Sequence, residues 1–353
     1  MISIQNRITA FVKLGNFLNQ FTINNIKKRA NIQYNEIFFE GFLHQIKLAQ
    51  ENNSWFTKNN ILFSIENISK LLTVNNLNNF IKNNSLKNNS SKNVAIIMAG
   101  NIPLVGFHDF LSVLISGHSA LVKQSSNDHH LLPFLAKYLE YVENGYKGKI
   151  TFTEGKLTSF EAVIATGSDN TARYFEYYFK NKPNIIRKNR NSVAVITGNE
   201  TKEDFIKLSD DIFHYYGLGC RSVSKLYVPK DYNFDLFFAG MYTKKEIIKN
   251  AKYANNYDYN KAVYLMSLFD LLENGFLIIK EDESYSSPIA TVFYEYFENE
   301  TDLKIKLHQD REKIQCIVAK DFLENEIPFG QTQYPTLTDY ADGVNTLEFL
   351  SKI

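Results

Sequence analysis

The sequence predicts an α/β protein built around a parallel sheet. Short apolar runs at residues 94–99, 120–123, 162–165 and 193–196 have the composition of buried strands, and helical patterns separate them. Strand–helix–strand order of this kind produces parallel strands joined by right-handed crossovers. A length of 353 residues and a hydrophobic content of 44% suit two domains, or one elaborated domain, with a large core.

The regions before and after these strands differ in pattern. Apolar residues recur at helical spacing over residues 4–20, 33–50 and 60–72, so the N-terminal part is predicted to be helical. Residues 75–93 are rich in Asn, Ser and Lys and have little to bury, which predicts a surface loop or domain junction. The predicted divisions of the chain are a helical region (1–92), an α/β domain (93–200), a second mixed α/β domain (201–335) and a polar tail that suits an arm or a capping segment (336–353).

Composition argues against several classes of partner and location. The net charge is +1 and the chain has no basic stripe or Arg-rich run, which argues against nucleic-acid binding. Two cysteines form no disulfide framework, as expected in a reducing compartment. The start has no apolar stretch of signal-peptide length, and no run reaches the roughly 18 apolar residues of a membrane span. We therefore expect a cytoplasmic protein without a membrane span.

Cys220 is the strongest candidate for a reactive group. It follows Gly217 and Gly219 and precedes Arg221. Glycines let backbone N–H groups approach a ligand closely, and surrounding N–H groups and cations favour the nucleophilic thiolate. A free cysteine is more often a small buried residue, and Cys316, in an apolar run without glycine, is predicted to be one. The segment around Cys220 is therefore predicted to form a thioester.

Three further polar segments come directly after predicted strands. They contain Asn101 after the first strand, Lys123 at the end of the second with Ser125 and Ser126 after it, and Gly167 and Ser168 after the third. Ligands of parallel sheets bind at the carboxyl ends of the strands. There, an Asn amide can donate to an oxyanion, a lysine can pair with an anion, and a helix start favours phosphate. Each segment alone is better explained by a turn, a solvated strand end or an ordinary N-cap, so the prediction depends on their joint order and position.

This order resembles the aldehyde dehydrogenase superfamily. There, a Pro-x-Asn-x-Pro loop, a Val-Lys-Pro-Ser-Glu strand end, a Thr-Gly-Ser helix start and a Gly-x-x-Cys nucleophile follow one another. The matching residues here are Asn101, Lys123, Gly167 with Ser168, and Cys220, and residues 327–332 resemble a later Pro-Phe-Gly-Gly motif. The resemblance spans residues 93–335. It implies an aldehyde-dehydrogenase-like fold with a Rossmann-type NAD(P)-binding domain (93–200) on which residues 1–92 pack, a catalytic domain (201–335) and a C-terminal arm (336–353).

More closely, the chain is similar to the LuxC-type acyl-CoA reductases, the fatty-acid reductase family. The similarity lies in residues 6–15, 217–222, 255–261, 330–333 and 339–343. It implies reduction of a fatty acyl-CoA or carrier-bound acyl thioester to the aldehyde through an S-acyl-Cys220 intermediate, with Asn101 stabilising the oxyanion. The implied hydride donor is NADPH, with NADH possible, and the implied cofactor-binding residues are Lys123, Ser125, Ser126, Gly167 and Ser168.

Two departures from the superfamily pattern bear on this chemistry. Arg187 occupies the position of the Glu that activates water in hydrolytic aldehyde dehydrogenases, and a cation cannot act as a general base. A thioester on Cys220 then lacks the group that would hydrolyse it, which suits a reductase. Ser126 replaces a ribose-binding Glu found in many NAD enzymes, which removes repulsion toward the 2′-phosphate of NADPH, and Lys123 can pair with that phosphate.

The resemblance also implies partners, and alternatives stay open. We expect a homo-oligomer, with an acyl-activating synthetase or transferase as a further partner. One alternative is an acyl-phosphate reductase of the same superfamily, favoured by a basic pocket around Arg187 and Arg190. Another is an acyl-receiving subunit without turnover of its own. A hydrolytic aldehyde dehydrogenase is disfavoured by Arg187. The acyl chain length and the donor, CoA or a carrier protein, stay open.

The histidines are weaker candidates. His108 and His214 lie near Asn101 and Cys220 in sequence, and either is a candidate to approach the thiol. His129 and His130 adjoin Asp128, but nothing supplies the remaining ligands of a zinc site, so no metal is predicted.

Overall fold

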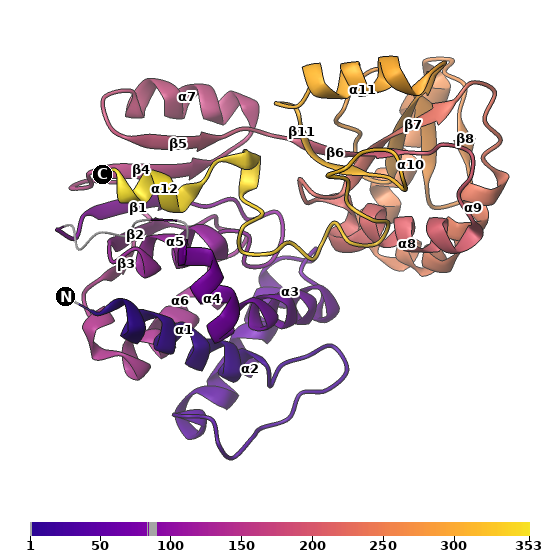
Figure 1. Ribbon diagram of the computed structural model, residues 1–353. Coiled ribbons are helices and arrows are strands. Elements are labelled where there is room, and N and C mark those ends of the chain that lie inside the picture. The colour runs from indigo at the N-terminus through magenta and orange to yellow at the C-terminus, as the bar shows by residue number, and fades with distance from the viewer. Residues whose placement is uncertain (1, 83, 85–89) are drawn as a thin grey trace. The chain divides into compact units, whose positions relative to one another are not determined.

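The computed structural model describes residues 2–82, 84 and 90–353, and it divides into two compact units (Figure 1). Unit 1 comprises Met1–Lys188 and Thr336–Ile353, and unit 2 comprises Asn189–Pro335. The chain thus passes from one unit to the other twice, at residues 188/189 and 335/336. The cofactor-binding and catalytic roles assigned to the two halves stay predictions.

Unit 1 is built on a five-stranded parallel sheet with the strand order β3-β2-β1-β4-β5. Its strands are β1 (Asn93–Ile97), β2 (Ser119–Lys123), β3 (Ile150–Phe152), β4 (Ala162–Thr166) and β5 (Asn184–Arg187). The crossovers contain α5 (Phe107–Ile115), α6 (Leu131–Val142) and α7 (Asp169–Phe179). The three predicted strands of this region are present, whereas β3 and β5 were not predicted because they are too short to carry a pattern.

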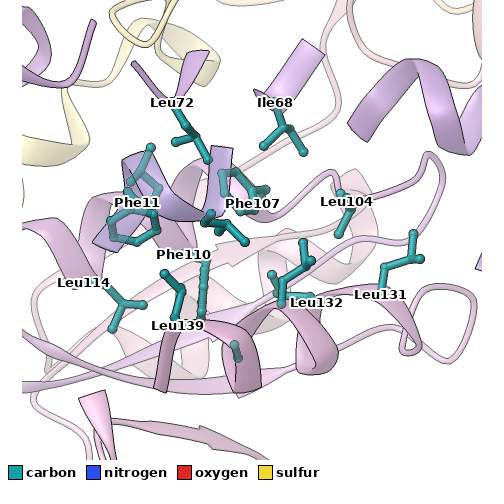
Figure 2. Packing of buried hydrophobic residues seen from close by; sticks show 14 of the residues in the cluster. Phe11, Ile68, Leu72, Leu104, Phe107, Phe110, Leu114, Leu131, Leu132 and Leu139 are labelled. Atoms are coloured by element: carbon teal, nitrogen blue, oxygen red, sulfur yellow. The ribbon is translucent and has the colours of Figure 1, made fainter. Parts of the chain in front are cut away.

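The N-terminal helices α1 (Ile4–Leu18), α2 (Asn35–Asn52) and α3 (Lys58–Leu71) agree closely with the predicted ranges. They share one apolar core with α5, α6 and the first sheet, and Figure 2 shows the packing. Phe11 of α1 and Leu72, just after α3, lie in this cluster together with Phe110 and Leu139 from the crossover helices. The helical region therefore completes the core of unit 1.

The prediction of a surface loop over residues 75–93 is wrong for its first part. Residues Val74–Lys82 form helix α4, and the Asn76 N–H donates to the Thr73 hydroxyl at 3.2 Å before its first turn. Leu77 and Phe80 are buried. Two apolar residues three positions apart are enough to anchor one helical face on the core, even in an Asn-rich stretch. Residues 83 and 85–89 lie outside the described residues.

The C-terminal segment folds onto unit 1. Helix α12 (Thr346–Ser351) packs against α5, and Leu347 and Leu350 are fully buried in the core described above. This contact agrees with a capping segment. Its use as an arm between copies of the chain stays a prediction.

Unit 2 contains a six-stranded sheet with the order β11-β6-β7-β10-β9-β8, parallel except for the pair β8 and β9. Its strands are β6 (Asn191–Val195), β7 (Val223–Pro229), β8 (Leu272–Glu273), β9 (Ile278–Glu281), β10 (Thr291–Phe297) and β11 (Ile314–Val318). Its α-helices are α8 (Lys202–Phe213), α9 (Asp235–Met241), α10 (Ala251–Met266) and α11 (Glu300–Gln309).

The strand at β6 was expected as the fourth strand of the first sheet, and the structure corrects this. β6 pairs with β7 and β11, so it belongs to the sheet of unit 2. An apolar run reports that a strand is buried but not which sheet buries it. One partner, β11, follows more than a hundred residues later in the chain. In the part of the chain that the structure describes, no helix has the length and apolarity of a membrane span.

Candidate active site

The predicted site residues of unit 1 follow three adjacent strands of its sheet. β1 lies between β2 and β4, and Ile97 at its end is level with Lys123 on one side and Ala165 on the other. The loops after these strands therefore start at one edge. A Cβ on Gly100 would lie 2.6 Å from both Cβ and Oγ of Ser125, so the loops after β1 and β2 are in direct contact.

The loop that carries Asn101 is held in place although Asn101 itself is exposed. The Ser64 hydroxyl donates to the Pro103 carbonyl oxygen at 2.8 Å, and the Leu104 N–H donates to Asp128 Oδ2 at 2.7 Å. Leu104 has φ 58°, a left-handed conformation that is costly for a leucine, and its side chain is buried in the core (Figure 2). Contacts on both sides thus fix the Asn101 loop.

Asp128 is part of this support. One carboxylate oxygen accepts from Leu104, while the other, Oδ1, is buried without a hydrogen-bond partner. Burial raises the pKa of the Asp128 carboxyl to about 6. Among the residues that the structure describes, no three His, Cys, Asp or Glu side chains gather as metal ligands. Asp128 is therefore a carboxyl that folding makes harder to ionise.

We expect Asp128→Asn to stabilise the protein at neutral pH. The folded-state pKa lies above the ordinary 3.8, so ionisation of Asp128 opposes folding above about pH 6, and this penalty fades as the pH falls toward 4. A shift of this size corresponds to at most about 3 kcal/mol. Urea unfolding at pH 7.5 and pH 5 checks this: the stability gain of the variant should be larger at pH 7.5. An equal gain, or a loss, at both pH values contradicts it.

The other polar groups at this edge surround the ends of β2 and β4. Lys123 Nζ donates to the Gly155 carbonyl oxygen at 2.9 Å, and Ser168 caps α7, its hydroxyl accepting from the Thr171 N–H at 3.4 Å. A Cβ on Gly167 would lie 3.0 Å from Thr171, so the Gly167 backbone packs directly on the first helical turn. Asp169, in that turn, offsets part of the positive end of the helix.

Arg187, whose role the sequence left open, is a buried ion-paired residue. Its Nη2 lies 2.8 Å from Asp109 Oδ1 and donates to the Thr346 hydroxyl at 3.0 Å, and both charged side chains are less than a tenth exposed. The ion pair joins β5, α5 and α12 within unit 1. The Asp109 carboxylate balances the charge of Arg187, so Arg187 does not supply the free cation of a basic pocket.

His108 likewise has a structural position. Its Nε2 lies 2.9 Å from the Leu337 carbonyl oxygen, and its ring packs against Phe80 and Tyr340. Burial lowers its pKa, which favours the neutral imidazole. These contacts place His108 in the packing of α5 against the C-terminal segment.

Cys220 lies in unit 2, between α8 and β7, and it is exposed, whereas Cys316 in β11 is buried. The prediction that Cys316 is a core residue is confirmed. The Ser222 N–H donates to the Gly219 carbonyl oxygen at 2.9 Å, and the Ser192 hydroxyl of β6 donates to the Cys220 carbonyl oxygen at 2.9 Å. The backbone around Cys220 is therefore fixed while its side chain is open to solvent.

His214 precedes this turn and caps the C-terminal end of α8, beside Asp210. Its Nδ1 is 3.2 Å from the Asp210 carbonyl oxygen and 3.9 Å from Asp210 Oδ1. Burial lowers the pKa of His214, with the Asp210 charge opposing that shift. Both of these contacts are with the preceding helix, α8.

Sequence reasoning missed the residues that support the site. Asp128, Ser192, Asp211 and Thr332 are all buried, and each hydrogen-bonds to a loop distant in sequence or to the Cys220 turn. The available signal was a polar residue at a buried position of a helix, as with Asp211, three positions after the buried Leu208 in α8. That signal does not name the partner, because the partner comes from a different element.

Solved structures of aldehyde dehydrogenases share this fold. Aldehyde dehydrogenase 21 from Physcomitrella patens, solved with the reaction product succinate, is 12% identical, with a TM-score of 0.64 over 91% of this chain and 74% of its own. An indole-3-acetaldehyde dehydrogenase solved with NAD+ is 12% identical, with a TM-score of 0.66 over 92% and 73%. The NAD+ complex of an aldehyde dehydrogenase from Bacillus cereus is 12% identical, with a TM-score of 0.61 over 92% and 72%. The predicted aldehyde-dehydrogenase-like fold is confirmed.

A comparison with curated proteins gives no match. A family profile described as acyl-CoA reductase (LuxC) matches residues 42–237, more than half of the chain. The chain therefore belongs to the LuxC family of acyl-CoA reductases and is an oxidoreductase acting on acyl or aldehyde groups.

Proposed function

We propose that the protein reduces an acyl thioester, a fatty acyl-CoA or a carrier-bound acyl group, to the aldehyde through an S-acyl-Cys220 intermediate. The observation that carries the proposal is that the Cys220 side chain is exposed on a turn whose backbone is fixed. The Ser192 hydroxyl donates to the Cys220 carbonyl oxygen, and the Ser222 N–H donates to the Gly219 carbonyl oxygen within the turn. Reactive cysteines are accessible and set among N–H groups or cations, whereas structural cysteines are buried and inert. Cys316 is the buried contrast within the same unit.

Acylation requires a thiolate and a means of stabilising negative charge on the carbonyl oxygen. The Cys220 sulfur forms a bond to the carbonyl carbon, the bond from that carbon to the donor thiol breaks, and the released thiolate takes up a proton. We assign the Asn101 amide and the Cys220 N–H as donors to the oxyanion. Removing one such donor typically costs about 10²–10³-fold in rate. The Asn101 loop, fixed by Asp128 and Ser64, suits a donor that must be preorganised.

The surroundings of Arg187 favour reduction over hydrolysis. Position 187 carries a cation, and that cation is neutralised by Asp109 in a buried pair. Residue 187 therefore supplies no carboxylate, and the Asp109 carboxylate is buried in the ion pair, so neither is placed to deprotonate water. The thioester on Cys220 then persists until it is reduced. Release of the aldehyde returns the sulfur as a thiolate, which needs no added base to leave.

The polar edge of the first sheet fits a nicotinamide dinucleotide. Lys123, Ser125, Ser126, Gly167 and Ser168 would hold it, and two of the aldehyde dehydrogenases with this fold were solved with NAD+. Gly100 and Gly167 support the fit. A Cβ on Gly100 would press on the loop that carries Ser125, and a Cβ on Gly167 would press on the first turn of α7, so the backbone packs closely at both positions. When bound, NADPH supplies the hydride for the reduction. Ser126 is exposed and brings no negative charge to this edge, which suits a 2′-phosphate.

We expect Ser126→Glu to shift the cofactor preference from NADPH toward NADH. The new carboxylate would repel the 2′-phosphate and could bind a ribose diol instead. At an exposed position this repulsion is worth on the order of 1 kcal/mol, about 5- to 10-fold in relative affinity. KM values for both cofactors check the prediction, with Ser126→Ala as the matched control that keeps the wild-type preference. Equal preference in Ser126→Glu and the wild type contradicts it.

The test of the proposed function is NADPH oxidation with acyl-CoAs of different chain lengths and detection of the aldehyde. Production of one aldehyde per NADPH supports it. An acyl phosphate is included because an acyl-phosphate reductase would use it in preference, and turnover of the acyl phosphate alone overturns the proposal. Acyl transfer to Cys220 without any NADPH oxidation would instead identify an acyl-receiving subunit. A homo-oligomeric state and an acyl-activating synthetase or transferase partner stay predictions.

A further inference from the structure

One residue from a distant loop, Thr332, binds residues at both ends of the segment that carries Cys220. Asp211 lies in the last turn of α8 and Arg221 directly follows Cys220, so the two bracket the segment. Both of their side chains bind Thr332: Asp211 accepts from its N–H and its hydroxyl, and Arg221 donates to its carbonyl oxygen. Thr332 is fully buried. All of these residues belong to unit 2.

Asp211 is buried and accepts three hydrogen bonds from the Thr332 loop. Its Oδ2 accepts from the Gly330 N–H at 2.6 Å, and its Oδ1 accepts from the Thr332 N–H at 2.9 Å and the Thr332 hydroxyl at 2.8 Å. Charge-assisted bonds of this kind are about twice as strong as neutral ones. The carboxylate therefore fixes the position of Thr332 relative to α8.

The backbone carbonyl group of Thr332 binds the Cys220 turn. The Thr332 carbonyl oxygen accepts from Arg221 Nε at 2.5 Å. Ser192 holds the neighbouring peptide, since its hydroxyl donates to the Cys220 carbonyl oxygen. The turn is thus attached to β6 through Ser192 and to α8 through Thr332 and Asp211.

The backbone between the two attachment points is strained. Tyr215, Tyr216 and Gly217 are consecutive residues with φ of 52°, 59° and 76°. Left-handed backbone costs a non-glycine residue roughly 1–2 kcal/mol and persists only where the surroundings enforce it. The Thr332 contacts lie at the two ends of this strained segment, through Asp211 on one side and Arg221 on the other.

We propose that Thr332 and Asp211 are positioning residues that keep the Cys220 turn in its reactive shape. This inference rests on the proposed function, because it takes Cys220 as the group that is acylated. Neither residue touches the substrate in the proposal. They act through Arg221 and the backbone of the strained segment, and a loosened turn would misplace the sulfur and the Cys220 N–H together. Misplacement by about 1 Å can cost on the order of 100-fold in rate.

The test compares Thr332→Val with Thr332→Ser in the full chain. Valine keeps the shape of threonine but removes the hydroxyl that donates to Asp211, whereas serine keeps it. The measurements are the single-turnover rate of Cys220 acylation by an acyl-CoA, the acyl-CoA concentration at half-maximal rate, and the urea midpoint. Asp211→Asn is the second variant, in case Thr332→Val does not fold. Thr201→Ala is the stability control, because it removes the capping box at the other end of α8.

We expect Thr332→Val to lower the acylation rate about 10- to 100-fold with the half-saturating concentration unchanged, and Thr332→Ser to stay within a few-fold of the wild type. The Thr201→Ala control should lose stability but not acylation rate. A normal rate in both Thr332→Val and Asp211→Asn overturns the inference while leaving the proposed function intact. So does a loss matched by Thr201→Ala. Failure of the wild type to be acylated on Cys220 overturns the proposed function itself.

Discussion

Cys220→Ala is expected to abolish both acyl transfer to the protein and reduction of the acyl group. The sulfur that forms the thioester is removed, and the other cysteine is buried and cannot replace it. Loss of a covalent nucleophile removes the whole two-step route. The change should be accommodated without unfolding, because Cys220 is exposed and its tethering bonds use its backbone. Aldehyde formation and acyl labelling, measured on the same preparation, check the prediction.

The matched control for this variant is Cys316→Ala. Cys316 is only 4% exposed in β11, so its truncation should lower stability and leave acylation intact. If Cys220→Ala still reduced acyl-CoA while Cys316→Ala was folded but inactive, the assignment of the nucleophile to Cys220 would be wrong.

Arg187→Met is expected to be the most destabilising single change discussed. It leaves the Asp109 carboxylate buried without its cation, and breaking a buried pair in this way typically costs about 3–5 kcal/mol. Replacing both partners, in Arg187→Met with Asp109→Leu, should recover most of that loss because no unpaired charge remains. Urea unfolding of the wild type, the single variant and the double variant measures the three free energies.

An exposed ion pair provides the control for Arg187→Met. Lys47 and Glu51 are 3.6 Å apart on α2, with their side chains 72% and 58% exposed, so Lys47→Met should change stability by less than about 1 kcal/mol. If Arg187→Met costs no more than Lys47→Met, the Arg187 pair does not hold β5, α5 and α12 together. A double variant as unstable as the single one would locate the cost in packing rather than in the unpaired charge.

The elements with a strong local pattern were predictable. The runs that became β1, β2 and β4 are continuous apolar segments of a parallel sheet, and the helices α1, α6 and α7 follow regular spacing or a capping residue. β5 has four residues of alternating burial, and α4 lies in an Asn-rich stretch anchored by Leu77 and Phe80. Such short elements are stabilised by the core around them, and their own sequence does not reveal that core.

The candidate site divides in the same way. Asn101, Lys123 and Ser168 were proposed because they lie at or just after strand ends, and Cys220 because two glycines precede it; their roles stay predictions. The residues that hold these loops in place could not be predicted from the sequence. Asp211 binds Thr332 across 121 positions of sequence, and Arg187 binds Asp109 across 78. These pairs exist only after the chain has folded. A polar residue in an apolar helix or strand signals that a partner exists without naming it.

The central claim is that Cys220 carries the acyl group before reduction. It is tested most directly by intact and peptide mass spectrometry of the protein mixed with a long-chain acyl-CoA, before and after NADPH is added. We expect the mass of one acyl group on the peptide that contains Cys220, and its disappearance with release of the aldehyde once NADPH is present. An acyl group on another residue, or aldehyde formation with no adduct on Cys220 in a rapid-quench time course, would contradict the account.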